Sequence, residues 1–223
     1  CTALTSITIP SGVTSIDSGI FSYCSSLVDI DVDSANENYT SIDGVVFSKD
    51  GTTLIAYPAG RNGAYEIPNI VTTIDAFAFE GCTGLTSVTI PDSVTTIGNY
   101  AFSSCAGLTS VTIPDSVTTI GYCVFNICTA LRSVTIPSSV TTIEDSVFYN
   151  CTSLTSVTIP NSVNTIGNYA FSGCSSLTTV YYTGTEEQWN AITIGSDNAP
   201  LTDATIHFES SAVTALAKSE DEE

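Results

Sequence analysis

A repeat of 23 residues constrains this chain more than any other feature of its sequence. Cysteines recur at that interval from Cys82 to Cys174, and Cys24 follows Cys1 by the same step. Leucine and phenylalanine positions recur with the same period. A fixed period of this length indicates a tandem array of one supersecondary unit.

The first part of each unit predicts a short strand. In residues 85–107, Val88 and Ile90 alternate with Ser87 and Thr89, a pattern typical of a strand with one buried face. Pro91 follows directly and ends the alternation, because proline has no N–H to donate to a strand ladder.

The rest of the unit predicts how the array folds. A second extended stretch is expected at 94–97, and the apolar spacing over 101–105 predicts one helical turn. A single unit has too few apolar side chains to offset roughly 1–2 kcal/mol of backbone entropy per residue. Stacked units can cover one another, so we expect a β-rich α/β solenoid with one parallel β-sheet face and short helical turns.

The repeated residues also resemble a known pattern. LTSVTIP followed by VTTIGNYAFSSC is similar to the BspA-like class of bacterial leucine-rich repeats, and the resemblance runs from Leu4 to Phe208. The units that open at Leu85, Leu108 and Leu154 each carry the whole set of apolar positions. The resemblance implies a right-handed leucine-rich-repeat solenoid with a parallel sheet on one face. It also implies a surface-exposed or secreted protein that binds other proteins.

We expect residues 1–208 to form a single solenoid in which one unit is longer than the others. This extended unit, 33–66, is expected to contain a β-hairpin over 45–57, since Asp50-Gly51 favours the positive φ of such a turn. The unit is either a binding protrusion or a variant coil that covers its own edge.

The end of the array departs from the repeat as well. Residues 183–208 predict a C-terminal cap, with a capping box at Thr185 and Gln188, a helix, and a last strand at 204–208. Residues 209–223 are expected to be an acidic tail or linker. No matching cap precedes Cys1, so further repeats or domains of the same chain are expected upstream.

The charge of the chain excludes two classes of partner. Four basic residues stand against 23 acidic ones, which gives a formal net charge of -19. Nucleic-acid binding needs clustered lysine and arginine, and an anionic membrane would repel this chain, so neither is expected as a partner. The sequence has no apolar run of about 18 residues, so no membrane insertion is expected.

Candidate catalytic and metal-binding residues are few. The cysteines follow the apolar phase and are interpreted as reduced core residues, and a zinc site would require CxxC spacing or nearby histidines. His207 is the only histidine and lies in a terminal strand with no partnered Ser or Cys arrangement in the sequence, so neither a Ser-His-Asp triad nor a multi-histidine metal site is expected. A pair of carboxylates could still hydrolyse glycosides, and this remains a minor hypothesis. No cofactor is expected.

One acidic stretch stands out. Asp29, Asp31 and Asp33 alternate with Ile30 and Val32, so the three carboxylates should share an exposed strand face. They could meet Ca²⁺ or a basic partner. The alternative interpretation is a solvated charged face.

The same strand parity predicts the exposed face of the sheet, which is rich in serine and threonine. The candidate partner-binding face comprises Asp29, Asp31, Ser87, Thr89, Ser110, Thr112, Ser133, Thr135, Ser156, Thr158, Thr179 and Tyr181. Such a face suits weak, multivalent contact, although rows of threonine also stabilise stacked strands.

Three function hypotheses follow. The first is a non-enzymatic, extracellular or cell-surface module of adhesin type that binds a protein or glycan on a host or neighbouring cell. The second is a structural spacer that projects another domain of a larger surface protein. The third is the carboxylate hydrolase.

Overall fold

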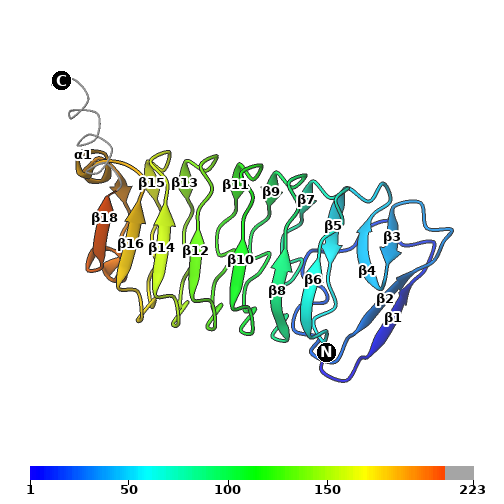
Figure 1. Ribbon diagram of the computed structural model, residues 1–223. Helices are drawn as coiled ribbons and strands as arrows, with labels where there is room; N and C mark the ends of the chain where they lie inside the picture. The colour runs from blue at the N-terminus through cyan, green and yellow to red at the C-terminus, as the bar shows by residue number, and fades with distance from the viewer. Residues whose placement is uncertain (209–223) are drawn as a thin grey trace, which may run out of the picture.

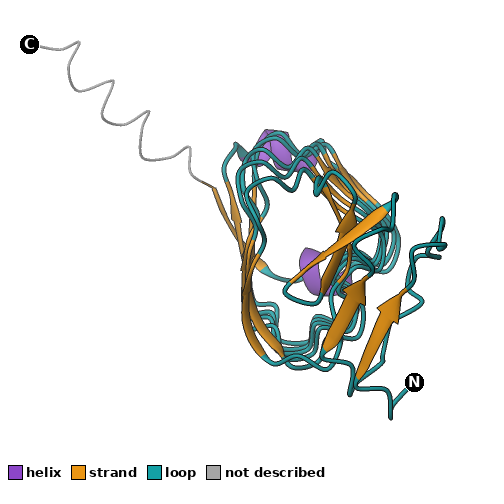
Figure 2. Cartoon of the chain, turned by 90° about the vertical axis from the view of Figure 1, so that its right-hand side faces the viewer, coloured by secondary structure: helices purple, strands orange, loops and turns teal. Residues whose placement is uncertain are grey.

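The computed structural model describes residues 1–208, which wind into coils stacked along one axis (Figure 1). The expected acidic tail, 209–223, lies outside the described residues. In the view along the axis, strands and turns surround an interior that the core side chains fill (Figure 2). None of the helices in the described part of the chain is long and apolar enough to cross a membrane.

Each regular coil contributes one strand to a wide row that forms the predicted face. The wide row consists of β1 (Ser6–Ile9), β2 (Asp29–Val32), β6 (Gly63–Glu66), β8 (Leu85–Thr89), β10 (Ser110–Thr112), β12 (Ser133–Thr135), β14 (Ser156–Ile159), β16 (Thr179–Tyr182) and β18 (Thr205–Phe208). Equivalent repeat positions pair in parallel, as Val88 does with Val111. The predicted solenoid with a parallel sheet face is confirmed.

The second extended stretch forms a narrow row of short strands. The narrow row consists of β7 (Thr73–Ile74), β9 (Thr96–Ile97), β11 (Thr119–Ile120), β13 (Thr142–Ile143), β15 (Thr165–Ile166) and β17 (Thr193–Ile194). These strands also pair in parallel, for example Ile97 with Ile120. The solenoid therefore has two rows of strands rather than one.

Neither row is continuous. The wide row divides into β1-β2, β6-β8-β10 and β12-β14-β16-β18, and the narrow row is interrupted between β11 and β13. Both rows thus break between the coil that holds β10 and the coil that holds β12. On the turn side of the same two coils the hydrogen bonds persist, since Phe125 N donates to Val147 O at 2.8 Å.

The segment expected to form a helical turn in each coil forms consecutive β-turns instead. Ala101 N and Cys105 N each donate to a carbonyl three residues earlier, whereas Phe102 N donates to Val124 O of the next coil at 3.0 Å. Tyr100 and Ser104 have φ of 58° and 59°. This left-handed backbone turns alternate amides toward the neighbouring coil, so no α-helix can form there.

Helices occur among residues 1–208 only near the C-terminal end, as α1 (Glu186–Asn190) and α2 (Ala199–Thr202). The capping box of α1 is formed as the sequence predicts, with Gln188 N donating to Thr185 Oγ1 at 3.1 Å. Strand β18 then pairs in parallel with β16.

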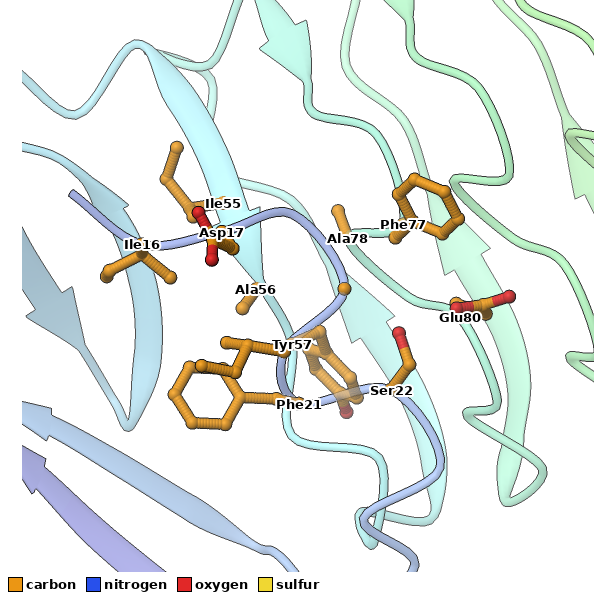
Figure 3. Close-up of a pocket in the computed structure, with 12 residues that line it drawn as sticks. Ile16, Asp17, Phe21, Ser22, Ile55, Ala56, Tyr57, Phe77, Ala78 and Glu80 are labelled. Carbon is orange, nitrogen blue, oxygen red and sulfur yellow. The ribbon is translucent and has the colours of Figure 1, made fainter.

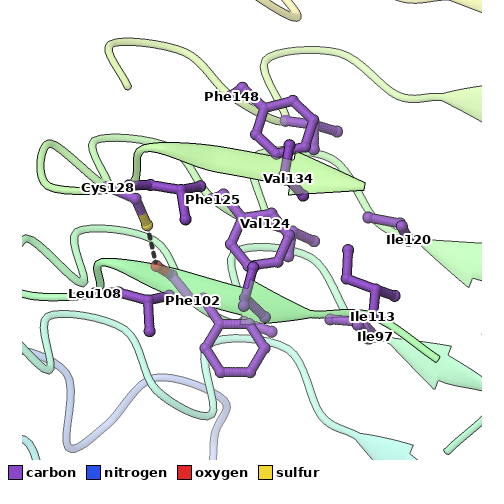
Figure 4. Packing of buried hydrophobic residues seen from close by; sticks show 14 of the residues in the cluster. Ile97, Phe102, Leu108, Ile113, Ile120, Val124, Phe125, Cys128, Val134 and Phe148 are labelled. Atoms are coloured by element: carbon purple, nitrogen blue, oxygen red, sulfur yellow. Dashed lines mark hydrogen bonds between the residues drawn. The ribbon is translucent and has the colours of Figure 1, made fainter. Parts of the chain in front are cut away.

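A ladder of phenylalanines runs through the core. Phe79, Phe102, Phe125, Phe148 and Phe171 are fully buried, and successive rings stack with centroids 4.8 to 5.6 Å apart. Figure 4 shows part of this ladder, with Leu108 and Cys128 beside it. Because each ring covers the next, no coil can bury its phenylalanine alone.

The repeat cysteines line the same core. The Cys128 thiol donates to Phe102 O at 3.2 Å (Figure 4), and the Cys105 and Cys151 thiols make the same contact one coil before and one coil after. All eight cysteines are free, and Cys1 is exposed while the other seven are buried. The seven buried positions agree with the interpretation of the cysteines as packing residues, whereas the exposed Cys1 departs from it.

The longer unit holds the antiparallel strands β3 (Tyr39–Ile42), β4 (Val45–Ser48) and β5 (Thr53–Ala56). The expected hairpin corresponds to β4 and β5, and the sequence did not indicate β3. Strand β5 pairs with β7, so the insertion extends the narrow row. It also separates a smaller hydrophobic cluster, which contains Leu27 and Ile30, from the main core.

Candidate functional site

The wide row presents most of the predicted Ser/Thr residues in register on one side. One outward repeat position is held by Ser87, Ser110, Ser133, Ser156 and Thr179; Ser87 pairs with Ser110, and Ser156 pairs with both Ser133 and Thr179. Thr89, Thr112, Thr135, Thr158 and Tyr181 occupy the next outward position. We name these ten residues the Ser/Thr face. Its central members, in β10 and β12, are exposed.

Hydroxyl groups beside the Ser/Thr face donate hydrogen bonds to carbonyls of a neighbouring coil. Thr109 Oγ1 donates to Thr86 O at 3.1 Å, and Ser116 Oγ donates to Val94 O at 2.7 Å. In each pair the acceptor belongs to the preceding coil. These side chains hold neighbouring coils together and are not free to bind a partner.

The hydroxyls of the Ser/Thr face differ in this respect. Ser110, Thr112, Ser133 and Thr135 make no side-chain hydrogen bond to any other residue of the described chain, and all four are exposed. Their donors and acceptors therefore point to solvent and are available to an external ligand.

An open groove follows one edge of this face, where the strands end at the repeated Ile-Pro. It has a volume of about 650 Å³, and Thr112, Thr135 and Thr158 line its side nearest the sheet. A second hollow of about 530 Å³ adjoins it at Asp92 and includes Thr89. Four predicted face residues thus also border a groove, which strand parity alone did not indicate.

Prolines and short polar side chains form the opposite wall of the groove. Pro114 and Pro137 lie there with Asp92, Asp115 and Ser138. Asp115 Oδ1 accepts a hydrogen bond from Ser138 N at 3.2 Å, so this carboxylate also ties two coils together. Asp92 and Asp115 were not among the candidate residues; their repeated place after Ile-Pro was the signal that could have marked the groove.

The break in the wide row coincides with the groove. Strands β10 and β12, which are not hydrogen-bonded to each other, supply Thr112 and Thr135. The phenylalanine rings of these two coils stay stacked, with Phe125 and Phe148 5.6 Å apart.

The structure does not join Asp29 and Asp31 to the Ser/Thr face. Both lie in β2, whose only strand partner is β1. Asp29 pairs with Arg61 of the longer unit, with Oδ1 and Nη2 3.8 Å apart. Asp33 lies beyond the strand, where its Oδ1 accepts from Ala35 N at 2.9 Å. Asp29 and Asp31 thus lie on either side of the buried Ile30, as strand parity predicts, but Asp29 is engaged by Arg61 and Asp33 follows the strand.

Tyr181 lies at the C-terminal end of the Ser/Thr face. Its ring is 49% exposed and stacks on His207 of β18, with centroids 5.5 Å apart. These are the only two large rings that the register places on the outward side of the wide row within residues 1–208.

A small cavity lies under the first coil and is shown in Figure 3. Residues 16–22, the end of β5 and the turn at 77–80 line it, together with Tyr57. Its volume is about 10 Å³, room for one water molecule at most. Ser22 Oγ is buried there without a partner in the described chain. This cavity cannot hold a substrate.

The remaining candidates for reactive groups in residues 1–208 are the acidic side chains, His207 and the cysteine thiols. Within residues 1–208 no cluster of three His, Cys, Asp or Glu side chains could hold a metal ion. Burial raises the pKa of the Cys105, Cys128 and Cys151 thiols well above the ordinary value of 9.0, and that of Cys174 to about 12. Neutral thiols of this kind are poor nucleophiles.

Comparison with solved structures shows the same architecture in bacterial proteins. A leucine-rich cell surface protein from Faecalibacterium prausnitzii is 40% identical, with a TM-score of 0.80, over 86% of this chain and 51% of that one. A leucine-rich repeat protein from Eubacterium ventriosum is 30% identical, with a TM-score of 0.80, over 91% and 59%. The pneumococcal vaccine antigen PcpA is 26% identical, with a TM-score of 0.81, over 97% and 53%.

The chain spans about half the length of each of these three structures. No curated protein sequence matches it. The sequence pattern of the BspA-type leucine-rich repeat region, in contrast, matches six copies over residues 1–63 and 61–178, and no catalytic family is indicated. With its 23-residue period and its stacked coils, the chain belongs to the family of BspA-type leucine-rich repeat proteins.

Proposed function

We propose that this chain is a non-enzymatic binding module of a bacterial surface protein, and that it contacts a protein or glycan partner through the Ser/Thr face. The main support for the proposal is that hydroxyl groups on the Ser/Thr face and hydroxyl groups beside it differ in their hydrogen bonding. Those beside the face bond to neighbouring coils, whereas the exposed hydroxyls of β10 and β12 make no such bonds.

The groove supports the same surface. It gives a partner a concave corner of about 650 Å³ bordered by threonine hydroxyls and proline rings. Asp92 and Asp115 add negative charge at its rim. A mixed polar and apolar border suits either an extended peptide or a sugar chain.

A location at the cell surface is part of the proposal. Its support is the Faecalibacterium prausnitzii protein, which is described as a cell surface protein and is 40% identical. Adhesion to a host or neighbouring cell is the activity that we expect from a repeat module in that place.

A binding screen tests the proposal. The purified chain is applied to immobilised extracellular-matrix proteins, cell surfaces and a glycan array, and compared with a variant carrying Ser110→Arg, Thr112→Arg and Thr135→Arg. The matched control carries Thr118→Arg, Thr141→Arg and Asn164→Arg, which add the same charge at exposed positions beside the narrow row. We expect saturable binding that the first variant loses and the control keeps.

The screen also distinguishes a binding module from a structural spacer. A spacer is favoured by the continuous phenylalanine stack, which stiffens the array over the coils from Phe79 to Phe171. Failure of the folded chain to bind any surface would contradict the binding proposal and favour the spacer. Equal loss of binding in both arginine variants would show that recognition does not use the Ser/Thr face.

A further inference from the structure

A second surface, away from the wide row, carries exposed aromatic rings. The turns that follow the narrow row place Phe77, Tyr100, Tyr122 and Tyr169 along one edge of the solenoid, which we name the aromatic edge. Phe77 and Tyr100 stack with centroids 4.9 Å apart, and Tyr122 meets Tyr100 edge-on at 5.3 Å. Tyr122 and Tyr169 are each 45% exposed.

The fold does not require aromatic residues at these positions. Tyr100 and Tyr169 have φ of 58° and 57°, a left-handed conformation that favours glycine or asparagine. Cys123 and Ser146 take the same place in the coils between them, with φ of 56° and 57°. Phe77 and Tyr100 are half-buried, whereas Tyr122 and Tyr169 are exposed. Since backbone conformation does not select a ring in this row, the exposed rings are typical of an interaction surface.

Carboxylates accompany the rings. Glu144 and Asp145 are exposed on the coil between Tyr122 and Tyr169. Asp197 lies beside Tyr169, where its charge and a hydrogen bond raise the pKa of that phenol. The edge is therefore both aromatic and acidic.

Basic side chains in the described part of the chain lie elsewhere. Lys49 bonds to the Asn36 carbonyl in the longer unit, Arg61 pairs with Asp29, and Arg132 precedes β12 of the wide row. The negative charge of the edge is not neutralised by any of them. A chain with a net charge of -19 would also attract a basic partner from a distance.

We propose that the aromatic edge binds an extended, arginine-rich segment of a partner protein. Guanidinium groups stack on tyrosine faces and form paired hydrogen bonds with carboxylates, and the edge offers both. Successive coils lie ~4.8 Å apart, so the three steps from Tyr100 to Tyr169 span roughly 14 Å, or about four residues of extended peptide. This surface is separate from the Ser/Thr face, and the proposal does not depend on that face.

The probe is a synthetic peptide that alternates arginine and serine, with fluorescence anisotropy as the readout at low and at physiological salt. A peptide with glutamine in place of arginine is its control. In the protein, Tyr122→Ala with Tyr169→Ala removes two ring faces, while Tyr122→Phe with Tyr169→Phe keeps them. Glu144→Gln with Asp145→Asn removes two charges from the edge.

The matched charge control is Asp92→Asn with Asp115→Asn at the groove. Asp115 and Asp145 each accept a hydrogen bond from the backbone of the next coil, and asparagine preserves an acceptor in both places. The two variants therefore lose equal charge with equal risk to the fold. Far-UV circular dichroism checks that every variant is folded.

We expect the arginine peptide to bind saturably and the glutamine peptide not to bind. The alanine pair should weaken binding about tenfold and the phenylalanine pair less than about threefold. The Glu144 and Asp145 variant should weaken it more than the groove control. Each affinity should fall as salt rises.

Three results would overturn the proposal. The first is no binding of the arginine peptide to the folded chain, and the second is unchanged binding by the alanine pair. The third is an equal loss in the two charge variants, which would mean that only the net charge matters. Tyrosine-dependent, salt-independent binding of a neutral oligosaccharide would instead make the edge a glycan surface.

Discussion

The phenylalanine ladder makes the stability of this protein depend on position along the array. Phe125 is fully buried, and its ring stacks between Phe102 and Phe148, with centroids 5.6 Å from each. Burial of such a side chain contributes about 1.5–3 kcal/mol. Each stacked pair adds about 0.5–1.5 kcal/mol. We predict that Phe125→Ala lowers the free energy of unfolding by about 3–5 kcal/mol, in the range of other large-to-small core changes.

Two comparisons test the reasoning behind that figure. Phe125→Leu keeps most of the apolar volume and loses the ring pairs, so it should cost about 1–2 kcal/mol. Phe21 holds the same repeat position in the first coil but is only partly buried. Phe21→Ala should therefore cost about 1–2 kcal/mol, because fewer neighbours cover that ring.

Urea unfolding at 25 °C, followed by far-UV circular dichroism, measures all three changes. A cost below about 1 kcal/mol for Phe125→Ala would refute the idea that stacking between coils stabilises the array. The idea would fail equally if Phe21→Ala proved as costly as Phe125→Ala, since position in the stack would then not matter.

Three further predictions concern the thiols, the turns and the cap. A maleimide reagent should label Cys1 in the folded chain and all eight cysteines only in denaturant, as counted by mass spectrometry. Because the folded chain raises the pKa of buried thiols such as Cys174 from 9.0 to about 12, the stability that they contribute is complete below pH 9. It should decline as pH rises toward 12, which urea midpoints at pH 7 and pH 10.5 would detect; an unchanged midpoint would contradict the burial. Gly81 has φ +73°, and an added Cβ would lie 2.7 Å from the Tyr23 ring, whereas Gly63 has φ +94° and open space around it. Gly63→Ala should cost about 1 kcal/mol and Gly81→Ala about 1–3 kcal/mol more in thermal unfolding, and equal costs would refute the steric argument. Thr185→Ala should destabilise the α1 region by about 1 kcal/mol in hydrogen exchange, with Thr185→Ser as the control that keeps the cap.

Much of the fold was predictable because the same alternation of apolar and polar residues recurs in every coil. Val88 and Val111 occupy one repeat position, and the parity of their strands fixes which side of the sheet each faces. The capping box at Thr185 is equally local, since both of its hydrogen bonds join residues three apart. The helical turn was predicted wrongly because apolar spacing over 101–105 fits a helix as well as it fits turns bonded to the next coil.

The candidate site was predictable only in part. Strand parity selected Thr112 and Thr135, and both are exposed as expected. It could not reveal that Asp29 pairs with Arg61, because these residues are 32 positions apart and meet only through the fold of the longer unit. Nor could it indicate the groove, which several successive coils form together where their strands end.

The sequence by itself determined the period, the register of the coils and the identity of the core residues, because each depends on spacing within one unit. The tertiary structure alone decided where both rows of strands break, which hydroxyls remain free, and which side chains line one edge of the solenoid. These features depend on contacts between coils, and near-identical repeats such as those at Leu85 and Leu108 do not encode the differences between their neighbours.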